Sequence, residues 1–441
     1  MNKIYIKTWG CQMNETDSFM IRKILETNTK YKHTNEYKKA NILILNTCSV
    51  REKAQEKLFH QLGRWKKLKM LNSNIIIAVG GCVANQEGEK IYKRAPYVDI
   101  IFGTQTIHLL PNMIEERIKK NKIIVNIKFK GLKKFNYFSN KKHINPKSYV
   151  TIMEGCNKKC SFCVVPTTRG KEINRSFKEI ILEIKQIVKK KIHEITLLGQ
   201  NVSSYFYLDK KNKKKYNFTN LLYKISKIKE IKRIRFITSH PKDFNNEVIN
   251  AYKNIPKLVD FLHLPIQSGS NKILKLMKRG YNIERYKKII YKLLKIRPNM
   301  QFSSDFIIGF PGETKKDFND TIKIITEINF DSSFSFIYSK RPNTIANKLI
   351  DNISLKEKKK RLYEVQKIIF NQTIQWNRRM IGTIQKILVE EKNKNKTGTL
   401  IGKTESNRTV HFKGFNDLIG KIILVKITKM KKKYFKGKIV S

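Results

Sequence analysis

Three cysteines stand close together in the stretch from Glu154 to Cys163. Cys156, Cys160 and Cys163 have the spacing C-x3-C-x2-C, and no fourth cysteine follows at short range. Zinc ribbons use paired C-x2-C units, and bacterial ferredoxin runs supply four cysteines. Three thiolates on one tight loop instead suit a cubane 4Fe–4S cluster with one open iron, where a substrate or cosubstrate can bind. The alternative is three packed or zinc-binding cysteines.

The other three cysteines, Cys11, Cys48 and Cys82, each follow a candidate strand. Ligands of open α/β sheets bind beyond the carboxyl ends of the strands, so we expect these thiols to converge although they are far apart in sequence. Glycines next to them would let the backbone turn tightly near a bulky ligand; they are Gly10, Gly80 and Gly81. As in the first trio, three cysteines stand without an obvious fourth ligand. The hypothesis is therefore a second cluster with one open iron. Buried structural cysteines are the alternative.

Residues 1–120 alternate apolar strands with amphipathic helical patterns. This βαβα order predicts a parallel, doubly wound sheet and an N-terminal α/β domain over 1–120. The predicted strands are Ile4–Thr8, Ile42–Asn46, Ile75–Val79 and Val98–Phe102. The predicted helices are Thr16–Thr27, Arg51–Lys69, Glu87–Arg94 and Ile107–Lys120. Residues 121–147 are rich in lysine and lack acidic residues, which favours a solvated basic linker over an ordered RNA site.

Residues 148–377 repeat strand and helix six times, which predicts an incomplete parallel (β/α)6 barrel. Its chemistry should lie on the loops at the carboxyl ends of the strands, and the Cys156 loop follows the first strand as this requires. The predicted strands are Tyr149–Met153, Glu194–Leu198, Arg233–Thr238, Phe261–Leu264, Phe302–Ile308 and Ser333–Tyr338. His240 and His263 should lie near the barrel mouth, as pocket residues or as structural histidines.

Residues 378–441 change to short alternating strands punctuated by glycine, which predicts a small antiparallel β-barrel. Near its end, lysines are interleaved with Tyr434 and Phe435. Such a surface can bind phosphates and stack bases, although a solvated basic tail is the alternative. The predicted strands are Ile384–Glu390, Gly398–Gly402, Thr409–Phe412, Ile422–Ile427 and Phe435–Val440.

The whole chain has 441 residues and a net charge of +57, with 92 Lys+Arg against 35 Asp+Glu. The length predicts two to four domains. The charge favours a polyanion such as RNA, although a general bias of the sequence toward Lys, Asn and Ile would also produce it. We find no run of 18 apolar residues and no leader peptide, so no membrane span and a cytoplasmic location are expected. Cytosolic thiols stay reduced, which favours metal or redox chemistry over disulfides.

The motifs together resemble the methylthiotransferase family of the radical S-adenosylmethionine (radical SAM) superfamily, nearly end to end. Two stretches, Val-Val-Pro-x-Thr-Arg-Gly and Gly-Gln-Asn-Val, resemble the tRNA-modifying branch that acts on dimethylallyladenosine more than its sister enzymes. The tail resembles the RNA-binding TRAM domain. One departure is Asn343, where the family usually has glycine; asparagine tolerates a positive φ best among the other residues. The matching segments are 8–15, 46–54, 80–84, 153–170, 198–202 and 304–314.

The resemblance implies two 4Fe–4S clusters and S-adenosylmethionine as cofactors. Cys156, Cys160 and Cys163 would hold the cluster that cleaves S-adenosylmethionine to a 5′-deoxyadenosyl radical. The other trio would hold an auxiliary cluster that carries or donates sulfur; it is Cys11, Cys48 and Cys82. A second S-adenosylmethionine would supply the methyl group. The expected substrate is tRNA with N(6)-dimethylallyladenosine at position 37, methylthiolated at carbon 2 of the adenine.

This chemistry agrees with the cysteine pattern, because an aromatic C–H bond has no useful acidity and needs a cofactor to break it. The resemblance identifies no catalytic residue beyond the cluster ligands, and no particular electron donor or sulfur source. Two other functions are to be distinguished. One is methylthiolation of a ribosomal protein, and the other is a non-catalytic RNA-binding protein with structural metal sites.

Overall fold

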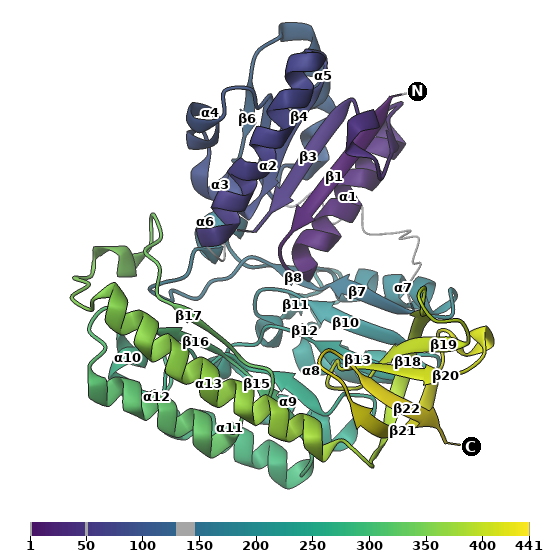
Figure 1. Ribbon diagram of the computed structural model, residues 1–441, viewed down its shortest axis with the longest axis vertical. Helices are drawn as coiled ribbons and strands as arrows, with labels where there is room; N and C mark the ends of the chain where they lie inside the picture. The colour runs from purple at the N-terminus through teal and green to yellow at the C-terminus, as the bar shows by residue number, and fades with distance from the viewer. Residues whose placement is uncertain (1, 49–51, 129–145, 441) are drawn as a thin grey trace.

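The computed structural model describes residues 2–48, 52–128 and 146–440. Figure 1 shows an N-terminal α/β unit above, a larger strand-and-helix unit below it, and a small β-barrel beside the larger unit. These are the three architectures expected from the sequence. Most of the expected linker 121–147 lies outside the described residues, as does the start of the helix expected at Arg51–Lys69.

The N-terminal unit is built on a six-stranded sheet in the order β2-β1-β3-β4-β5-β6, with every neighbouring pair parallel. Alternate residues of β3 join two separate apolar clusters, Leu43 and Leu45 in one, Ile42 and Ile44 in the other. Since successive side chains point to opposite faces, the sheet is buried on both sides. The doubly wound prediction is confirmed. The strands are β1 (Lys3–Trp9), β2 (Lys32–His33), β3 (Ile42–Thr47), β4 (Ile76–Gly81), β5 (Ile100–Phe102) and β6 (Ile124–Asn126).

Two details differ from the sequence expectation. The edge strands β2 and β6 were not predicted, because two or three residues give no readable alternation. The helix expected over Glu87–Arg94 is two short helices that break at Gly88, where φ is +52°. The helices of this unit are α1 (Gln12–Asn28), α2 (Glu52–Leu71), α3 (Cys82–Glu87), α4 (Lys90–Arg94) and α5 (Leu110–Lys120).

The middle unit is an open parallel barrel, as expected. Strand pairing gives the order β7-β10-β13, then β14-β15 and β16-β17, and a bridge from Ile234 to Leu258 continues it from β13 toward β14. The strand expected at Phe302–Ile308 is split at Ser304, whose amide donates to the Ser333 hydroxyl. The strands are β7 (Lys147–Thr151), β10 (Glu194–Leu198), β13 (Arg233–Phe236), β14 (Phe261–His263), β15 (Gln301–Ser303), β16 (Asp305–Ile308) and β17 (Phe334–Ile337).

Helices cover the outer face of this barrel, and a large apolar cluster fills the space between them and the strands. The helices are α6 (Val165–Arg169), α7 (Phe177–Val188), α8 (Phe218–Ser226), α9 (Asn246–Asn254), α10 (Asn271–Leu276), α11 (Ile283–Ile296), α12 (Lys315–Ile328) and α13 (Leu355–Arg379). Two short strands beside the cysteine loop pair with each other, β8 (Met153–Glu154) and β9 (Ile173–Asn174).

The C-terminal unit is a closed five-stranded barrel in the order β18-β19-β20-β22-β21. We expected it to be antiparallel, and it is except where β20 pairs with β22 in parallel. A closed ring with an odd number of strands cannot alternate direction all the way round, so one parallel pair is unavoidable. The strands are β18 (Ile384–Lys392), β19 (Thr399–Lys403), β20 (Thr409–Lys413), β21 (Ile422–Met430) and β22 (Phe435–Ile439).

This small barrel docks at the amino ends of the central strands. Arg233, at the start of β13, bonds to Glu194 and donates to the backbone carbonyl of Lys386. Arg408 of the small barrel reaches the fully buried carboxylate of Asp331, just before β17, at 2.6 Å. The cysteine loop, in contrast, follows the carboxyl end of β7. The small barrel and the cysteine loop therefore lie at opposite ends of the central strands.

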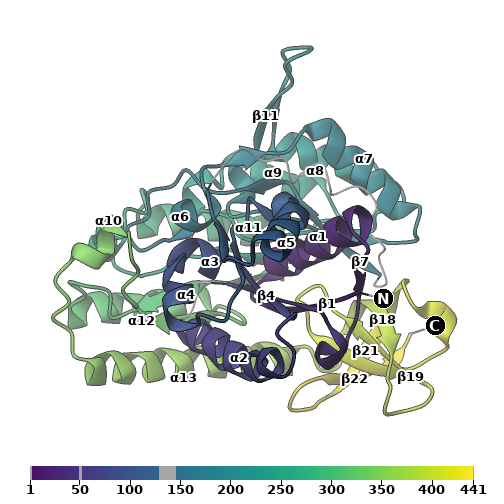
Figure 2. The same cartoon turned by 90° about the horizontal axis from the view of Figure 1, so that it is seen from above.

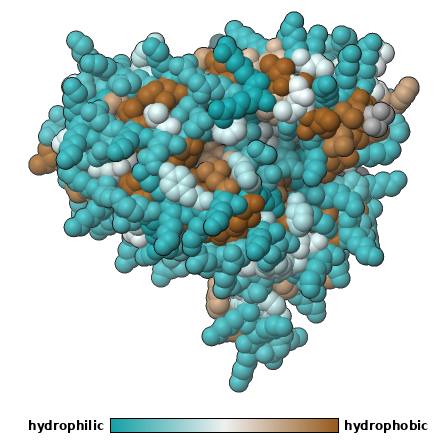
Figure 3. Space-filling view, turned by 90° about the horizontal axis from the view of Figure 1, so that it is seen from below, coloured by the Kyte–Doolittle hydropathy of each residue, from teal (hydrophilic) through white to brown (hydrophobic). Residues whose placement is uncertain are grey.

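One hairpin projects from the molecule. It consists of β11 (Phe206–Leu208) and β12 (Lys215–Asn217), and it is the long finger in Figure 2. Figure 3 shows hydrophilic side chains over its tip and over most of the face seen there. No helix in the described part of the chain is long and apolar enough to cross a membrane.

Candidate active site

Three adjacent strands of the N-terminal sheet each lead into one cysteine. Cys11 precedes α1 directly after β1, Cys48 follows β3, and Cys82 is the first residue of α3 after β4. Because β1, β3 and β4 are neighbours in the sheet, their carboxyl ends bring the three thiols together. Cys48 is hydrogen-bonded to both Cys11 and Cys82.

The thiols form a strongly polarised group. The hydrogen bond from Cys48 is the main cause that lowers the pKa of Cys11 to about 6 and that of Cys82 to about 7. The Arg169 guanidinium lowers both pKa values further. The pKa of Cys48 is raised, because it lies beside the sulfurs of both Cys11 and Cys82. Cys11 therefore favours the thiolate near neutral pH and Cys82 is close to evenly divided between thiol and thiolate, which is the form that binds metal.

Glycine is required beside these cysteines because a side chain there would clash with neighbouring atoms. Gly81 has a φ of +92°, and a Cβ there would lie 2.4 Å from Asn46 Oδ1. A Cβ on Gly10 would lie 2.8 Å from the Cβ of Cys48, so a side chain would push this cysteine away. Gly80 instead makes room for the Phe102 ring, 2.2 Å from the ideal Cβ position. Its role is packing of the sheet and not the approach of a ligand.

The second trio lies on one loop that is fixed at its start and in its middle. Gly155 adopts a φ of +80°, and its amide donates to Gln200 Oε1 at 2.7 Å. Ser161 is fixed on both sides, because its amide donates to the carbonyl of Met277 and its own carbonyl accepts from Ala346. These contacts position the cysteines of the loop, Cys156, Cys160 and Cys163, which are all partly buried.

Each sulfur of this loop has an N–H group near it. The amides of Lys158 and Val165 donate to the sulfurs of Cys156 and Cys163 at 3.4 and 3.5 Å. Arg279 Nη1 lies 3.5 Å from the sulfur of Cys160. Such donors stabilise negative charge on thiolates, and they tune the reduction potential of a bound iron–sulfur cluster. Burial raises the pKa of Cys163 to about 12.

His240 lies at the barrel mouth as expected, with its Nε2 3.8 Å from the sulfur of Cys160. Its Nδ1 accepts from the amide of Lys242, and its own amide donates to Asn201. Burial lowers the pKa of His240 to about 2, so this ring stays neutral. His263 is the last residue of β14, and its Nδ1 is 2.7 Å from the Ser303 hydroxyl.

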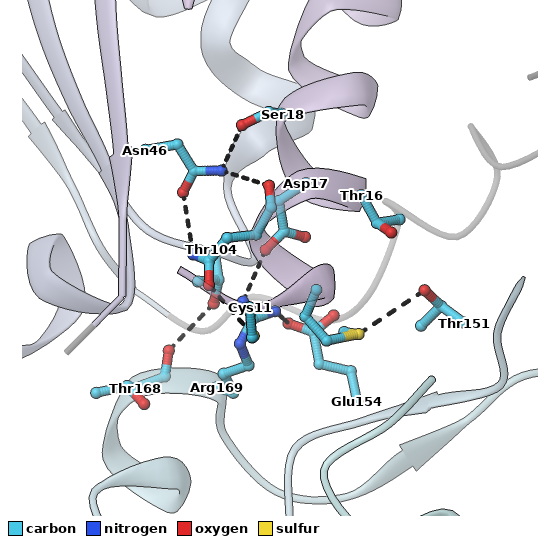
Figure 4. A network of polar contacts seen from close by, with 12 residues as sticks. Cys11, Thr16, Asp17, Ser18, Asn46, Thr104, Thr151, Glu154, Thr168 and Arg169 are labelled. Carbon is cyan, nitrogen blue, oxygen red and sulfur yellow. Dashed lines mark hydrogen bonds and ion pairs between the residues drawn. The ribbon is translucent and has the colours of Figure 1, made fainter. Parts of the chain in front are cut away.

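Arg169 joins the two halves of the site. It lies at the end of α6, directly after the cysteine loop, and only 3% of its side chain is exposed. Its Nη1 is 3.1 Å from Glu154 of the barrel, and its Nη2 is 2.8 Å from Asp17 of α1. Figure 4 shows the guanidinium pointing from the barrel toward α1 beside Cys11.

Three further contacts hold the same segment against the N-terminal unit. The carbonyl of Thr168 accepts from Asn85 at 2.9 Å and from Thr104 at 3.1 Å, and the carbonyl of Arg169 accepts from Gln105 at 2.7 Å. Asn85 is one helical turn after Cys82. Sequence reasoning assigned Arg169 no role beyond that of a family signature, because its partners in the N-terminal unit come from segments at least 64 residues away.

Three family models match the chain in succession. Residues 3–103 match the uncharacterized protein family UPF0004, residues 150–325 match the radical SAM superfamily, and residues 378–440 match the TRAM domain. A protein of Buchnera aphidicola subsp. Cinara cedri named tRNA-2-methylthio-N(6)-dimethylallyladenosine synthase is 62% identical over 97% of this chain and 99% of its own length. The chain belongs to the tRNA-2-methylthio-N(6)-dimethylallyladenosine synthase family.

A relative from Haemophilus influenzae with the same name is 49% identical over 99% of this chain and 92% of its own length. Among solved structures, the radical S-adenosylmethionine methyltransferase TsrM from Kitasatospora setae is similar, with a TM-score of 0.54 at 11% identity, over 79% of this chain and 75% of its own. The cobalamin-dependent radical enzyme OxsB has a TM-score of 0.51 at 12% identity, over 84% of this chain and 56% of its own. These two likenesses concern the fold.

Membership of the radical SAM superfamily implies a 4Fe–4S cluster and S-adenosylmethionine. The loop of Cys156, Cys160 and Cys163 fits such a group, because it offers three sulfurs with N–H donors around them and no fourth cysteine. The trio of the N-terminal sheet fits a metal group ligated by thiolates as well. The pKa values of Cys11 and Cys82 are lowered, and the buried Arg169 places a positive charge next to these sulfurs.

Proposed function

We propose that this protein methylthiolates tRNA at carbon 2 of N(6)-dimethylallyladenosine at position 37, with S-adenosylmethionine as cosubstrate. The observation that carries the proposal is the full-length identity of 62% to a relative of that name. The two cysteine trios support it, as do the buried ion pairs of Arg169 that connect the barrel with the N-terminal unit. We place the domain boundaries at 1–120 for the methylthiotransferase unit, 121–147 for the linker, 148–377 for the radical SAM core and 378–441 for the TRAM domain.

In this proposal each trio holds one 4Fe–4S cluster. Cys156, Cys160 and Cys163 would hold the cluster at which S-adenosylmethionine binds. The cluster and S-adenosylmethionine together would supply the radical that removes the hydrogen from the adenine ring. The other trio would hold an auxiliary cluster that supplies the sulfur; it consists of Cys11, Cys48 and Cys82.

The residues around the first trio have three tasks. Gln200 and Ser161 fix the cysteine loop, which keeps the three sulfurs in one orientation. Arg279 and the neutral His240 lie beside Cys160, where the cation balances thiolate charge. The amides of Lys158 and Val165 donate to the sulfurs of Cys156 and Cys163, where they stabilise negative charge.

Arg169 has the task of joining the two trios. One end of its segment continues the cysteine loop of the barrel, and its guanidinium lowers the pKa of Cys11 and Cys82. A reaction that removes hydrogen at one place and delivers sulfur to the same carbon needs both places at a fixed separation. The buried contacts of Arg169, Thr168 and Asp17 provide that fixed geometry.

The test is mass spectrometry of digested tRNA from a strain that lacks this gene. We expect the methylthio derivative to disappear and the dimethylallyl precursor to remain. Return of the derivative on expression of this chain, and no return with Cys82→Ala, would assign the activity to it. An unchanged methylthio peak in the deletion strain would contradict the proposal. Modification of a ribosomal protein by purified enzyme that ignores tRNA would point to the sister activity instead.

A further inference from the structure

The outer face of α13 carries a stripe of basic and aromatic side chains that the proposed chemistry does not use. The buried positions of this helix define one face; they are Lys358, Arg361, Val365, Ile369 and Gln372. At 100° per residue, the opposite face is occupied by Lys356, Lys360, Tyr363, Lys367, Phe370, Ile374 and Arg378. Cations and apolar side chains are interleaved along this stripe, and it contains no acid, although Glu364 stands beside it.

The two aromatic rings of the stripe are unusually exposed. Tyr363 is 71% exposed and Phe370 is 64% exposed, and they are seven residues apart on the same face. A lysine-rich composition alone explains lysines on an outer helix face. It does not explain two aromatic rings among them, since burying a ring in the core is favourable and exposing it is not.

The position of α13 gives the stripe a direction. Near its beginning, Arg361 pairs with Glu313 at 2.8 Å, in the loop beyond the carboxyl end of β16. Near its end, Trp376 donates to the carbonyl of Asn329, and Asn377 contacts Arg408 of the small barrel. The 25 residues of the helix span about 37 Å. The stripe therefore runs from the rim of the barrel mouth to the docked C-terminal barrel (Figure 1).

We propose that this face of α13 binds RNA along its length, between the mouth that receives the target base and the C-terminal barrel. Lys360 and Lys367 would contact phosphates, and Tyr363 and Phe370 would stack on bases, as in sequence-tolerant nucleic-acid surfaces. Charge favours this occupant over a protein or a lipid tail, because the stripe pairs cations with flat rings. The proposal rests on the tRNA substrate proposed above, and it adds a surface outside the TRAM domain.

The test measures binding of a synthetic anticodon stem–loop RNA with dimethylallyladenosine to the full-length protein, by fluorescence anisotropy at several salt concentrations. The double variant Tyr363→Ala/Phe370→Ala should weaken binding at least about fivefold, since each stacked base contributes that much or more. The double variant Lys360→Gln/Lys367→Gln should reduce the slope of log K against log salt by about 1.5. Tyr363→Trp keeps a stacking surface and should retain wild-type affinity.

Helix α7 offers matched controls, because its exposed face carries Lys178, Leu182 and Lys185 at similar spacing without an aromatic ring. The variants Lys178→Gln/Lys185→Gln and Leu182→Ala should bind RNA within about twofold of wild type. Equal weakening by the α7 and α13 lysine pairs would overturn the proposal, because it would show a general charge effect. Wild-type affinity of the aromatic variant would overturn it too, provided that thermal melting shows all variants folded.

Failure of the proposed function and failure of the proposed RNA-binding surface would give different results. If wild-type enzyme bound the RNA but formed no methylthio product, the proposed reaction would be wrong while the binding surface stood. If the wild type formed product and the α13 variants bound normally, only the surface would be wrong.

Discussion

Arg169 and Asp17 form an ion pair across the boundary between the barrel and the N-terminal sheet, with 2.8 Å between Nη2 and Oδ2. Both side chains are at most 3% exposed. Because Arg169 belongs to the barrel unit and Asp17 to the N-terminal unit, the ion pair holds these two units together. It also stands next to both cysteine loops, since Arg169 is six residues after Cys163 and Asp17 is six residues after Cys11.

Replacement of Arg169 by alanine should loosen this boundary. Breaking a buried pair from one side costs about 3–5 kcal/mol, because the remaining carboxylates stay buried without their counter-charge. We expect faster hydrogen exchange in α1 and α6, together with S-adenosylmethionine cleavage that no longer leads to methylthio product. Arg169→Lys keeps the charge but cannot fork between two carboxylates, so an intermediate effect is expected. Wild-type exchange rates in the alanine variant would contradict this role.

The two cysteine trios should behave differently when mutated. Cys156→Ala should abolish 5′-deoxyadenosine formation, whereas Cys82→Ala should leave this cleavage largely intact and block sulfur insertion. Each variant is the control for the other. If Cys82→Ala also stopped the cleavage, the proposed division of roles would be wrong.

Anaerobically purified wild type should contain about eight iron and about eight sulfide per chain, as expected for two cubanes on cysteine thiolates. The variants Cys156→Ala and Cys82→Ala should each retain about half of this iron and sulfide. Colorimetric iron and sulfide determination measures this directly. Zinc in place of iron would instead support a structural metal site.

Arg408 should secure the C-terminal barrel. Asp331 is fully buried and Arg408 reaches both of its oxygens, at 2.6 and 2.8 Å. Arg408→Ala should cost about 3–5 kcal/mol of docking stability, seen as faster hydrogen exchange in β19 and β20. The matched control is Lys421→Ala, which removes an exposed pair with Asp417 and should cost at most about 1 kcal/mol. Equal losses of docking stability in Arg408→Ala and Lys421→Ala would contradict the role given to Arg408.

Asn343 adopts a φ of +61°, which confirms that the turn at this position needs the left-handed conformation. Asn343→Gly should therefore leave stability unchanged or slightly higher, whereas Asn343→Val should cost about 1–2 kcal/mol. Thermal denaturation of the two variants measures the difference. Asn347→Val, four residues on at an exposed position with ordinary φ, is the control and should have a smaller effect.

Local patterns in the sequence predict the individual units well. The run Ile42–Leu45 is apolar throughout because β3 is buried on both faces, and the cysteines after β1, β3 and β4 lie at one edge because parallel strands end there together. The position of Cys11, Cys48 and Cys82 near one another follows from this rule and from their place after neighbouring strands.

Contacts between units could not be predicted in the same way. Arg169 lies in a family motif and Arg408 between β19 and β20, and neither setting indicates burial or a partner. Both become important only once Asp17 and Asp331 are packed against them. The parallel pair β20–β22 is a property of ring closure and not of either strand. The short strands β2 and β6 owe their existence to the neighbouring strands more than to their own residues.

The two trios differ in when their ligands can meet. Cys156, Cys160 and Cys163 lie within eight residues, so their sulfurs are close even before the chain folds. Cys11, Cys48 and Cys82 come together only after β1, β3 and β4 have paired. If each trio holds a cluster as proposed, iron delivery to the N-terminal sheet must follow folding of the apoprotein, whereas delivery to the central loop can begin on the nascent chain.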